Sequence, residues 1–255
     1  MRELRTLLCG LCVFLASALI PATAAGQASG PLPPLEPSDR VRWQAVGVVN
    51  FEGPAGIPSC SGTLIAPDLV LTAAHCAGGR KAGQSARAFV IGWNGLTHVT
   101  FQTASRLRVY PPYVAASGVA AFPFDIGVLQ LDAPIPAHVA TPVPLAPDTA
   151  LNTNPVALMA YHRMAQRQLH GRFDCTARPA RRGTMIATDC TVVSGNSGGA
   201  LLVQDAGEWK LGAVLVARAG ADGTALAVPV NDWVRSELAA ARQRASDRAQ
   251  GGAAD

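Results

Sequence analysis

The sequence predicts an all-β protein of two similar halves followed by one α-helix. From Val41 onward, short runs of β-branched and apolar residues alternate with a period close to two. Glycine, proline, asparagine and aspartate punctuate these runs at short intervals, as they do between the strands of sheet proteins. No ten-residue stretch with helical periodicity interrupts them, which argues against a fold that alternates strands with helices.

The expected strands fall into two groups on either side of a proline-rich connector. They cover residues 45–51, 62–65, 70–72, 88–91 and 126–131 in the first group, and 156–161, 200–203, 211–216 and 224–230 in the second. The connector carries Pro134, Pro136, Pro142, Pro144 and Pro147. We therefore assign residues 41–135 to an N-terminal β half, and residues 136–230 to the connector and a C-terminal β half.

The helix is expected after the last strand, over residues 231–255 together with a frayed tail. Asn231 or Asp232 can cap its N-terminus, and Trp233, Leu238 and Ala239 supply apolar positions. No other stretch of the chain has this combination of cap and spacing.

The first 24 residues have the pattern of a secretory signal peptide. Arginines precede an apolar run from Leu7 to Ile20, and residues 22–24 are small enough for cleavage. This run is too short for a membrane span, and no later stretch is long and apolar enough for one. We expect a secreted or periplasmic protein without a membrane anchor after signal removal. Residues 25–40, rich in proline, glycine and serine, are expected to form an extended leader.

Four cysteines follow the signal peptide, and an even number in an exported chain predicts two disulfides. Three pairings are possible, of which Cys60–Cys76 and Cys175–Cys190 close short local loops. Each such loop is expected to stabilise the fold by about 3 kcal/mol. A zinc site is the alternative, but the cysteines lack C-x-x-C spacing and only His75 lies near them, so no metal is expected.

Charge and motif content narrow the range of partners. The net charge is only +4, and no basic stripe is interleaved with aromatic residues, which argues against nucleic acid. No acidic cluster has the spacing of a calcium loop, and no cofactor motif is present, so we expect no cofactor. A chain of about 230 residues after signal removal has room for one large or two small cores, and we expect a monomer.

Two motifs carry residues suited to nucleophilic catalysis. Leu71–Cys76 places His75 at the end of an apolar run beside an expected disulfide, which would fix the position of a base. A core histidine beside a structural crosslink is the alternative interpretation. In Gly195–Gly199, glycines at positions −2, +1 and +2 flank Ser197. Successive N–H groups of such a turn can bind a developing oxyanion, although a plain glycine-rich turn has the same composition.

A serine nucleophile at neutral pH needs a base, and the base needs a carboxylate that orients it. Asp125 is the candidate, because it opens the strand 126–131 and can be buried beside a histidine. The competing carboxylates Asp68, Asp132 and Asp148 lie beside prolines or in the connector, and we interpret them as surface turn residues.

These motifs, together with Cys60–Ile65 and the order His, Asp, Ser, resemble the trypsin/chymotrypsin family of serine peptidases. The resemblance runs from about Val41 to the terminal helix and is closest to bacterial secreted members, including relatives of the glutamyl endopeptidases. It implies a pair of six-stranded antiparallel β-barrels with the active site between them, and protein or peptide substrates.

The same resemblance implies roles for individual residues. His75, Asp125 and Ser197 would form the catalytic triad of an endopeptidase, and the N–H groups of Gly195 and Ser197 would form the oxyanion hole. A non-catalytic secreted binding protein on a protease scaffold is the alternative function. Such relatives usually lack one of the three catalytic groups, and all three are present here.

The chain departs from the family pattern just before the nucleophile, where many members carry Asp and this sequence has Asn196. That Asp forms an ion pair with a new N-terminus after cleavage of a precursor, and an amide cannot form it. We therefore expect the oxyanion loop to form without internal cleavage, although Arg40–Val41 could still serve as a processing point.

Specificity is expected to depend on the primary pocket, which in the family is built near Thr191 and the strand Leu215–Arg218. Thr191 is not acidic, so a preference for Lys or Arg is not supported, and the histidine of glutamyl endopeptidases is missing from the strand. Ala217 and Ala219 replace the usual glycines and narrow the slot, which favours a small or medium apolar residue before the cleaved bond. Arg218 can be interpreted in two ways. It is either a solvated residue at the end of the strand, or a group that reaches into the pocket and attracts an acidic residue of the substrate.

Overall fold

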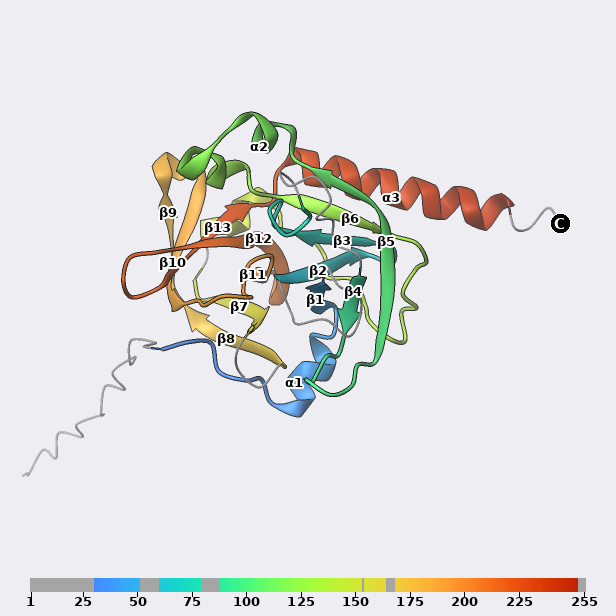
Figure 1. Cartoon of the computed structure of the whole chain (residues 1–255), viewed down its shortest axis with the longest axis horizontal. Helices are drawn as coiled ribbons and strands as arrows, with labels where there is room; N and C mark the ends of the chain where they lie inside the picture. The colour runs from blue at the N-terminus through green and yellow to red at the C-terminus, as the bar shows by residue number, and fades with distance from the viewer. Residues whose placement is uncertain (1–29, 51–59, 79–87, 153, 164–167, 252–255) are drawn as a thin grey trace, which may run out of the picture.

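A computed structural model describes residues 30–50, 60–78, 88–152, 154–163 and 168–251. Two β-rich halves lie side by side, the first coloured blue to green and the second yellow to orange, and a long helix follows them (Figure 1). The mostly β architecture with a C-terminal helix confirms the expected fold class. The expected signal peptide at residues 1–24 lies outside the described residues.

The first half is a closed six-stranded antiparallel barrel, with strands in the order β1-β2-β3-β6-β5-β4. The strands are β1 (Val46–Asn50), β2 (Cys60–Ala66), β3 (Leu69–Thr72), β4 (Ala88–Ile91), β5 (Thr100–Val109) and β6 (Gly127–Leu131). Five of the six are buried at every position, whereas β5 is exposed at alternate positions near its start. Closure leaves this half without a free sheet edge, and its interior is filled by side chains such as Leu64, Phe89 and Leu129.

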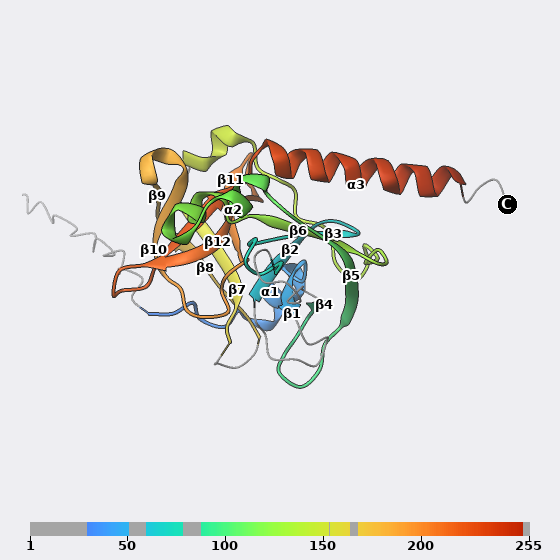
Figure 2. The ribbon, with the colours of Figure 1, turned by 45° about the horizontal axis from the view of Figure 1, so that its top comes forward.

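The second half is a seven-stranded antiparallel sheet in the order β8-β7-β11-β12-β13-β10-β9. The strands are β7 (Val156–Tyr161), β8 (Leu169–Cys175), β9 (Ala177–Ala180), β10 (Met185–Thr191), β11 (Ala200–Asp205), β12 (Glu208–Ala219) and β13 (Thr224–Pro229). Figure 2 shows β7, β8, β10 and β12 of this half beside the first barrel.

The count of seven strands, where the resemblance implies six, has a local cause at Thr176. This residue alone separates β8 from β9. Its N–H and hydroxyl donate to the carboxylate of Asp189 at 2.7 and 2.6 Å, and the N–H of Asp189 donates back to its carbonyl at 3.1 Å. Because β8 pairs with β7 and β9 pairs with β10, the two edge strands are successive parts of one bent segment.

Among the described residues, five short helical segments connect these strands or precede them. They are α1 (Pro37–Arg42), α2 (Pro111–Ala115) and the 3₁₀ turns η1 (Gly118–Phe124), η2 (Asp148–Asn152) and η3 (Arg181–Gly183). The pair α2 and η1 leads directly into Asp125 and then β6, so it determines where that carboxylate lies.

The segment before β1 is anchored to the second half of the molecule. The N–H of Leu35 donates to the Leu169 carbonyl at 3.0 Å, and the N–H of Gly171 donates to the Pro33 carbonyl at 2.9 Å. Leu32 and Leu35 are buried. Helix α1 begins at Pro37, inside the range expected to be extended, because proline at the first helical position already has a helical φ.

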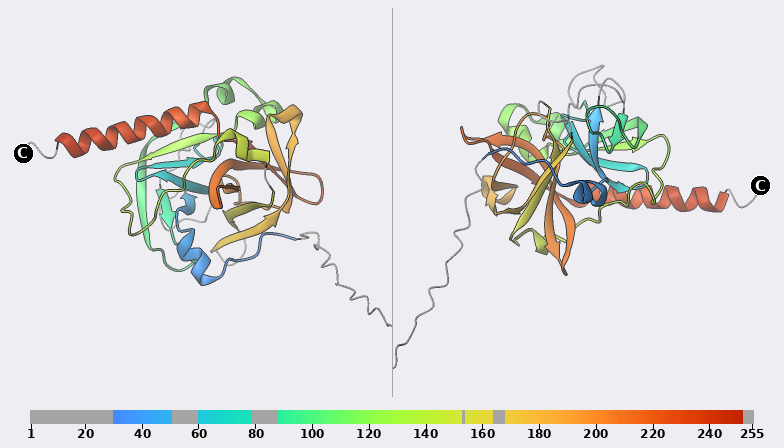
Figure 3. Two further views of the ribbon diagram at one scale, coloured as in Figure 1. Left: turned by 180° about the vertical axis from the view of Figure 1, so that it is seen from behind. Right: turned by 90° about the horizontal axis from the view of Figure 1, so that it is seen from below.

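The C-terminal helix α3 (Asp232–Gly251) packs on the first barrel and then projects beyond it (Figure 3). The side-chain oxygen of Asn231 accepts a hydrogen bond from the N–H of Val234 at 3.1 Å, so Asn231 is its N-cap. Val234, Leu238 and Ala241 form the buried stripe at spacings of four and three. No described helix is both long and apolar enough to cross a membrane.

Asp68 does not lie on the surface as the sequence suggests, since only 2% of it is exposed. Arg248 of α3 donates to its carboxylate at 2.7 Å, and the side chain of Gln130 donates to its backbone carbonyl at 2.9 Å. The interpretation as a surface turn residue is wrong because the terminal helix returns across the β2–β3 turn. Asp132 and Asp148 are exposed, as expected.

Candidate active site

His75 and Asp125 are joined by two hydrogen bonds. The ring Nδ1 lies 2.7 Å from one carboxylate oxygen, and the backbone N–H of His75 donates to the other at 2.9 Å. The Asp125 side chain is 4% exposed, whereas the His75 side chain is 38% exposed. A buried carboxylate therefore orients an imidazole whose other face remains open to solvent, which is the arrangement a general base needs.

The turn that carries His75 is fixed on both sides. The N–H groups of Cys76 and Ala77 donate to the carbonyl of Ala73 at 3.0 and 3.1 Å. The disulfide Cys60–Cys76 ties the turn to the start of β2, and the neighbouring Ala74 is fully buried. The imidazole is thus attached to a segment that cannot shift without disturbing the barrel.

Asp125 takes its position from the end of η1. Its N–H donates to the carbonyl of Phe122 at 3.2 Å, and the N–H of Ile126 donates to the carbonyl of Phe124 at 2.8 Å. Ile126 is fully buried and begins the segment that continues as β6. The aspartate is therefore fixed by the chain on each side, with its carboxylate left to bond His75.

The Ser197 turn docks directly on the first barrel. The N–H of Ser61 donates to the Ser197 carbonyl at 2.7 Å, and Thr72 donates through its hydroxyl to the Ser61 carbonyl at 2.7 Å. Gly198 has a φ of +81°, and a Cβ there would lie 2.0 Å from the Ser61 carbonyl oxygen. Only glycine allows this approach, which brings Ser197 beside the strand that leads into His75.

The loop before Ser197 is held by buried hydrogen bonds of Asn196, whose exposed fraction is 1%. Its amide nitrogen donates to the carbonyl of Tyr161 at 2.7 Å, and its amide oxygen accepts from the N–H of Val193 at 2.7 Å. The N–H of Arg163 also donates to the Ser194 carbonyl at 3.0 Å. An aspartate could accept from the N–H of Val193 but could not donate to the Tyr161 carbonyl. This loop therefore needs both the donor and the acceptor of the amide.

Ser61 extends this network in a way the sequence did not reveal. Its hydroxyl donates to the Gly195 carbonyl at 3.1 Å and accepts from the Tyr161 N–H at 2.8 Å. In the sequence, its place beside Cys60 is the one signal. It becomes informative once β2 and β7 are known to lie together.

The two N–H groups named for an oxyanion hole are available for a ligand. Gly195 has a φ of +99°, and a Cβ there would lie 2.6 Å from the backbone nitrogen of Arg163. Within the described ranges, neither the N–H of Gly195 nor that of Ser197 donates a hydrogen bond. The N–H of Asn196 between them is paired with the Val193 carbonyl at 3.1 Å, so Gly195 and Ser197 supply the two N–H groups of this turn that can bind negative charge.

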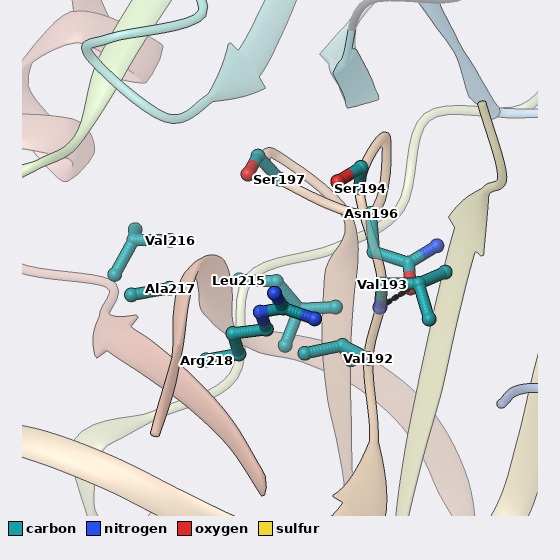
Figure 4. A pocket seen from close by; sticks show the side chains of 9 residues that line it. All are labelled: Val192, Val193, Ser194, Asn196, Ser197, Leu215, Val216, Ala217 and Arg218. Atoms are coloured by element: carbon teal, nitrogen blue, oxygen red, sulfur yellow. Dashed lines mark hydrogen bonds between the residues drawn. The ribbon is translucent and has the colours of Figure 1, made fainter. Parts of the chain in front are cut away.

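A cavity of about 220 Å³ opens beside Ser197 (Figure 4). Residues 192–194, 196–197 and 215–218 line it, so Ala217 and Arg218 belong to its wall. Thr191 is not among the lining residues. Its hydroxyl donates instead to the carbonyl of Asp222 at 3.0 Å, and this bond directs it toward the β12–β13 turn.

A second cavity of about 510 Å³ adjoins His75 and Asp125. Its other lining residues come mainly from α2 and η1, including the aromatic rings of Tyr113 and Phe122. Val216 and Ala217 line both cavities. The histidine and the serine therefore face two neighbouring hollows that share one strand as a wall.

The alternative of a metal site can be tested against the cysteine groups. Among the described residues, two clusters have metal-ligating atoms close together, and each contains a pair of cysteines. In both clusters the sulfurs are joined as the disulfides Cys60–Cys76 and Cys175–Cys190. A disulfide sulfur is not the thiolate that zinc requires, so neither cluster fits a zinc ion.

Comparisons with known proteins agree with this geometry. The family model described as trypsin-like peptidase domain matches residues 60–212 of the 255-residue chain. A solved structure titled "Structure of Glu endopeptidase in complex with MPD" superposes with a TM-score of 0.67 and 20% sequence identity, over 85% of this chain and 99% of that one. No curated protein matches the sequence. The structural likeness supports the chymotrypsin-like fold, and the matched segment contains His75, Asp125 and Ser197. The chain belongs to the trypsin-like peptidase family.

Proposed function

We propose that the protein is a secreted serine endopeptidase that acts through His75, Asp125 and Ser197. The observation that carries the proposal is the pair of hydrogen bonds between Asp125 and His75. The Cys60–Cys76 disulfide beside His75 adjoins Ser61, whose N–H bonds the Ser197 carbonyl, and this supports a role for Ser197 in the same site. The available N–H groups of Gly195 and Ser197 supply the second requirement, a site for negative charge.

In the proposed reaction, each of these residues has one role. The Ser197 hydroxyl oxygen attacks the carbonyl carbon of the peptide bond, and its proton moves to the Nε2 atom of His75. The Asp125 carboxylate accepts a hydrogen bond from Nδ1–H and stabilises the imidazolium, while the N–H groups of Gly195 and Ser197 bind the oxyanion. His75 then gives the proton to the leaving amine. Water attacks the resulting acyl-enzyme in the same way and regenerates Ser197.

The surroundings of the triad support a peptide substrate. The cavity beside Ser197 suits the side chain that precedes the cleaved bond, and the cavity beside His75 suits residues further upstream. Both open toward the same strand, β12, along which an extended peptide could pair. Two disulfides favour an oxidising compartment, which agrees with secretion to the medium or periplasm. The chemistry needs no cofactor, and we propose that the enzyme acts as a monomer.

Replacement of the nucleophile tests this function. Ser197→Ala is expected to lower the turnover of a quenched peptide library by a factor on the order of 10⁴ or more. Ser246→Ala, at an exposed position on α3, is the matched control and is expected to retain full turnover. Peptide cleavage that survives in Ser197→Ala at the rate of the control would reject the proposal.

A further inference from the structure

The cavity beside Ser197 has one ionisable side chain in its wall. Apolar residues form most of the lining, namely Val192, Val193 and the β12 segment that begins at Leu215. Arg218 is the exception, and in Figure 4 its guanidinium extends into the cavity from β12, on the side of Leu215 and Val192. A substrate side chain that enters from Ser197 therefore meets a cation.

This guanidinium has no partner within the part of the chain that the structure describes. No ion pair or hydrogen bond of Arg218 occurs there. Asp222 lies in the adjacent β12–β13 turn, but its carboxylate accepts from the hydroxyl and the N–H of Thr224. These bonds lower the pKa of Asp222 and hold it in its own turn. An arginine that faces a cavity without a carboxylate leaves a position for an anionic ligand.

On the basis of the proposed endopeptidase function, we propose that Arg218 selects substrates with a glutamate or aspartate before the cleaved bond. The carboxylate of that residue would lie between Leu215 and Val192 and form a charge-assisted hydrogen bond with the guanidinium. The apolar walls strengthen this interaction, because a bound substrate displaces water from the exposed arginine. A lysine or arginine at the same place would meet a like charge.

This proposal differs from the preference for a small apolar residue that Ala217 and Ala219 suggest in the sequence. Ala217 lines the cavity and Ala219 does not, and the cavity of about 220 Å³ also has the cationic Arg218 in its wall. An apolar side chain there would face the guanidinium and offer it no hydrogen bond in place of the water that it displaces.

Four quenched peptides that differ only in the residue before the cleaved bond test the proposal. With Glu, Gln, Ala or Lys at that place, the native protein is expected to give kcat/KM values about ten- to a hundredfold higher for Glu than for Gln. The Glu-to-Gln ratio is expected to fall to about one in Arg218→Gln and to persist in part in Arg218→Lys, because lysine keeps the charge but loses the planar fork. Arg242→Gln, which removes an equal charge from an exposed position on α3, is the control and should keep the native ratio.

A fluorophosphonate label on the native protein separates the two levels of failure. Labelling at Ser197 together with a Glu-to-Gln ratio near one would overturn the role of Arg218 and leave the endopeptidase proposal intact. Absence of both labelling and cleavage would overturn both proposals. An unchanged Glu-to-Gln ratio in Arg218→Gln would also overturn the role of Arg218. Each ratio compares two substrates on one preparation of one protein, so a reduced fraction of folded enzyme in a variant does not change it.

Discussion

Asp125 bonds both the ring and the backbone of His75, at 2.7 and 2.9 Å. One carboxylate oxygen sets the tautomer of the imidazole, and the other fixes the turn that carries it. The carboxylate does this from a nearly buried position, with 4% of its side chain exposed. Both the orientation and the local backbone of the base therefore depend on a single side chain.

Asp125→Asn is expected to lower kcat by about 10⁴-fold with a smaller change in KM. The amide occupies the same volume, but it favours the wrong tautomer of His75 and gives no charge to stabilise the imidazolium. Steady-state kinetics on a peptide substrate measure this, with His138→Ala as a control at an exposed histidine. A loss of less than tenfold would mean that another group orients His75.

The two disulfides provide a matched pair, since they close loops of nearly equal length, with sequence separations of 16 and 15. Replacing either pair by alanines is expected to lower the free energy of unfolding by about 3 kcal/mol. Only loss of Cys60–Cys76 is expected to lower kcat of the folded protein strongly, because Cys76 adjoins His75. Urea unfolding measures the free energy of unfolding, and kinetics normalised by active-site titration give kcat. Equal effects of the two disulfides on kcat would contradict the role of Cys60–Cys76 in holding His75.

Asn196 is expected to hold the oxyanion loop, so Asn196→Ala should lower kcat more than it raises KM. The variant leaves the N–H of Val193 and the carbonyl of Tyr161 without buried partners, at a cost of about 1–3 kcal/mol for each group. Asn196→Asp retains the bond from the N–H of Val193. It also places a carboxylate oxygen next to the Tyr161 carbonyl oxygen, and because the two repel each other we expect it to lower kcat as well. Native kcat in Asn196→Asp would show that the donor to Tyr161 is dispensable.

Activity is expected without cleavage at Arg40–Val41. Val41 is 70% exposed in α1, and the segment before it is anchored by the buried Leu32 and Leu35. Cleavage would detach this anchored segment, whereas the oxyanion loop is already held by Asn196. Intact mass measurement alongside active-site titration tests the expectation. Activity that appears only in molecules that begin at Val41 would refute it.

Acid is expected to destabilise the fold through His170, which is 3% exposed. Burial lowers the pKa of His170, and the neighbouring His162, whose pKa burial also lowers, adds to the effect. Below about pH 6.5 the unfolded chain binds these protons more readily than the folded one, so stability is present above that pH and is lost as pH falls.

His170→Asn is expected to reduce this pH dependence, because an amide takes up no proton in this pH range. Its nitrogen can still donate to the Gln168 carbonyl that Nδ1 contacts at 2.7 Å, so the fold is expected to be retained. Urea unfolding at about pH 7.5 and about pH 5.5 gives the difference for native protein and variant. An equal loss of stability in both proteins would assign the effect to other groups.

The sequence contains clear motifs around the candidate catalytic residues, whereas it gives little sign of the residues that hold them in place. His75 and Ser197 stand in motifs of small residues and glycines that close packing requires. Gly198 shows this most directly, since any side chain there would clash with the backbone of Ser61. The hydroxyl of Ser61 itself could not be assigned a role, because its partners lie 100 and 134 positions away.

Long-range packing also accounts for the errors. Asp68 stands beside proline in the pattern of a surface turn, and it is buried only because Arg248, 180 positions later, folds back over it. Thr176 interrupts a strand through its bonds to Asp189 on another strand. The local sequence pattern predicts neither the Arg248–Asp68 contact nor the Thr176–Asp189 contact. Helix α1 was missed for a different reason, because it is too short to show a helical period.

The account depends most directly on Ser197 as a nucleophile that His75 activates. Fluorophosphonate labelling of the native protein, with the adduct mapped by mass, measures both, because the probe forms a bond only with an activated serine. We predict one adduct per molecule, on Ser197, and its loss in Ser197→Ala and His75→Ala but not in His138→Ala. An adduct on another serine, or none at all on folded native protein, would contradict the central claim.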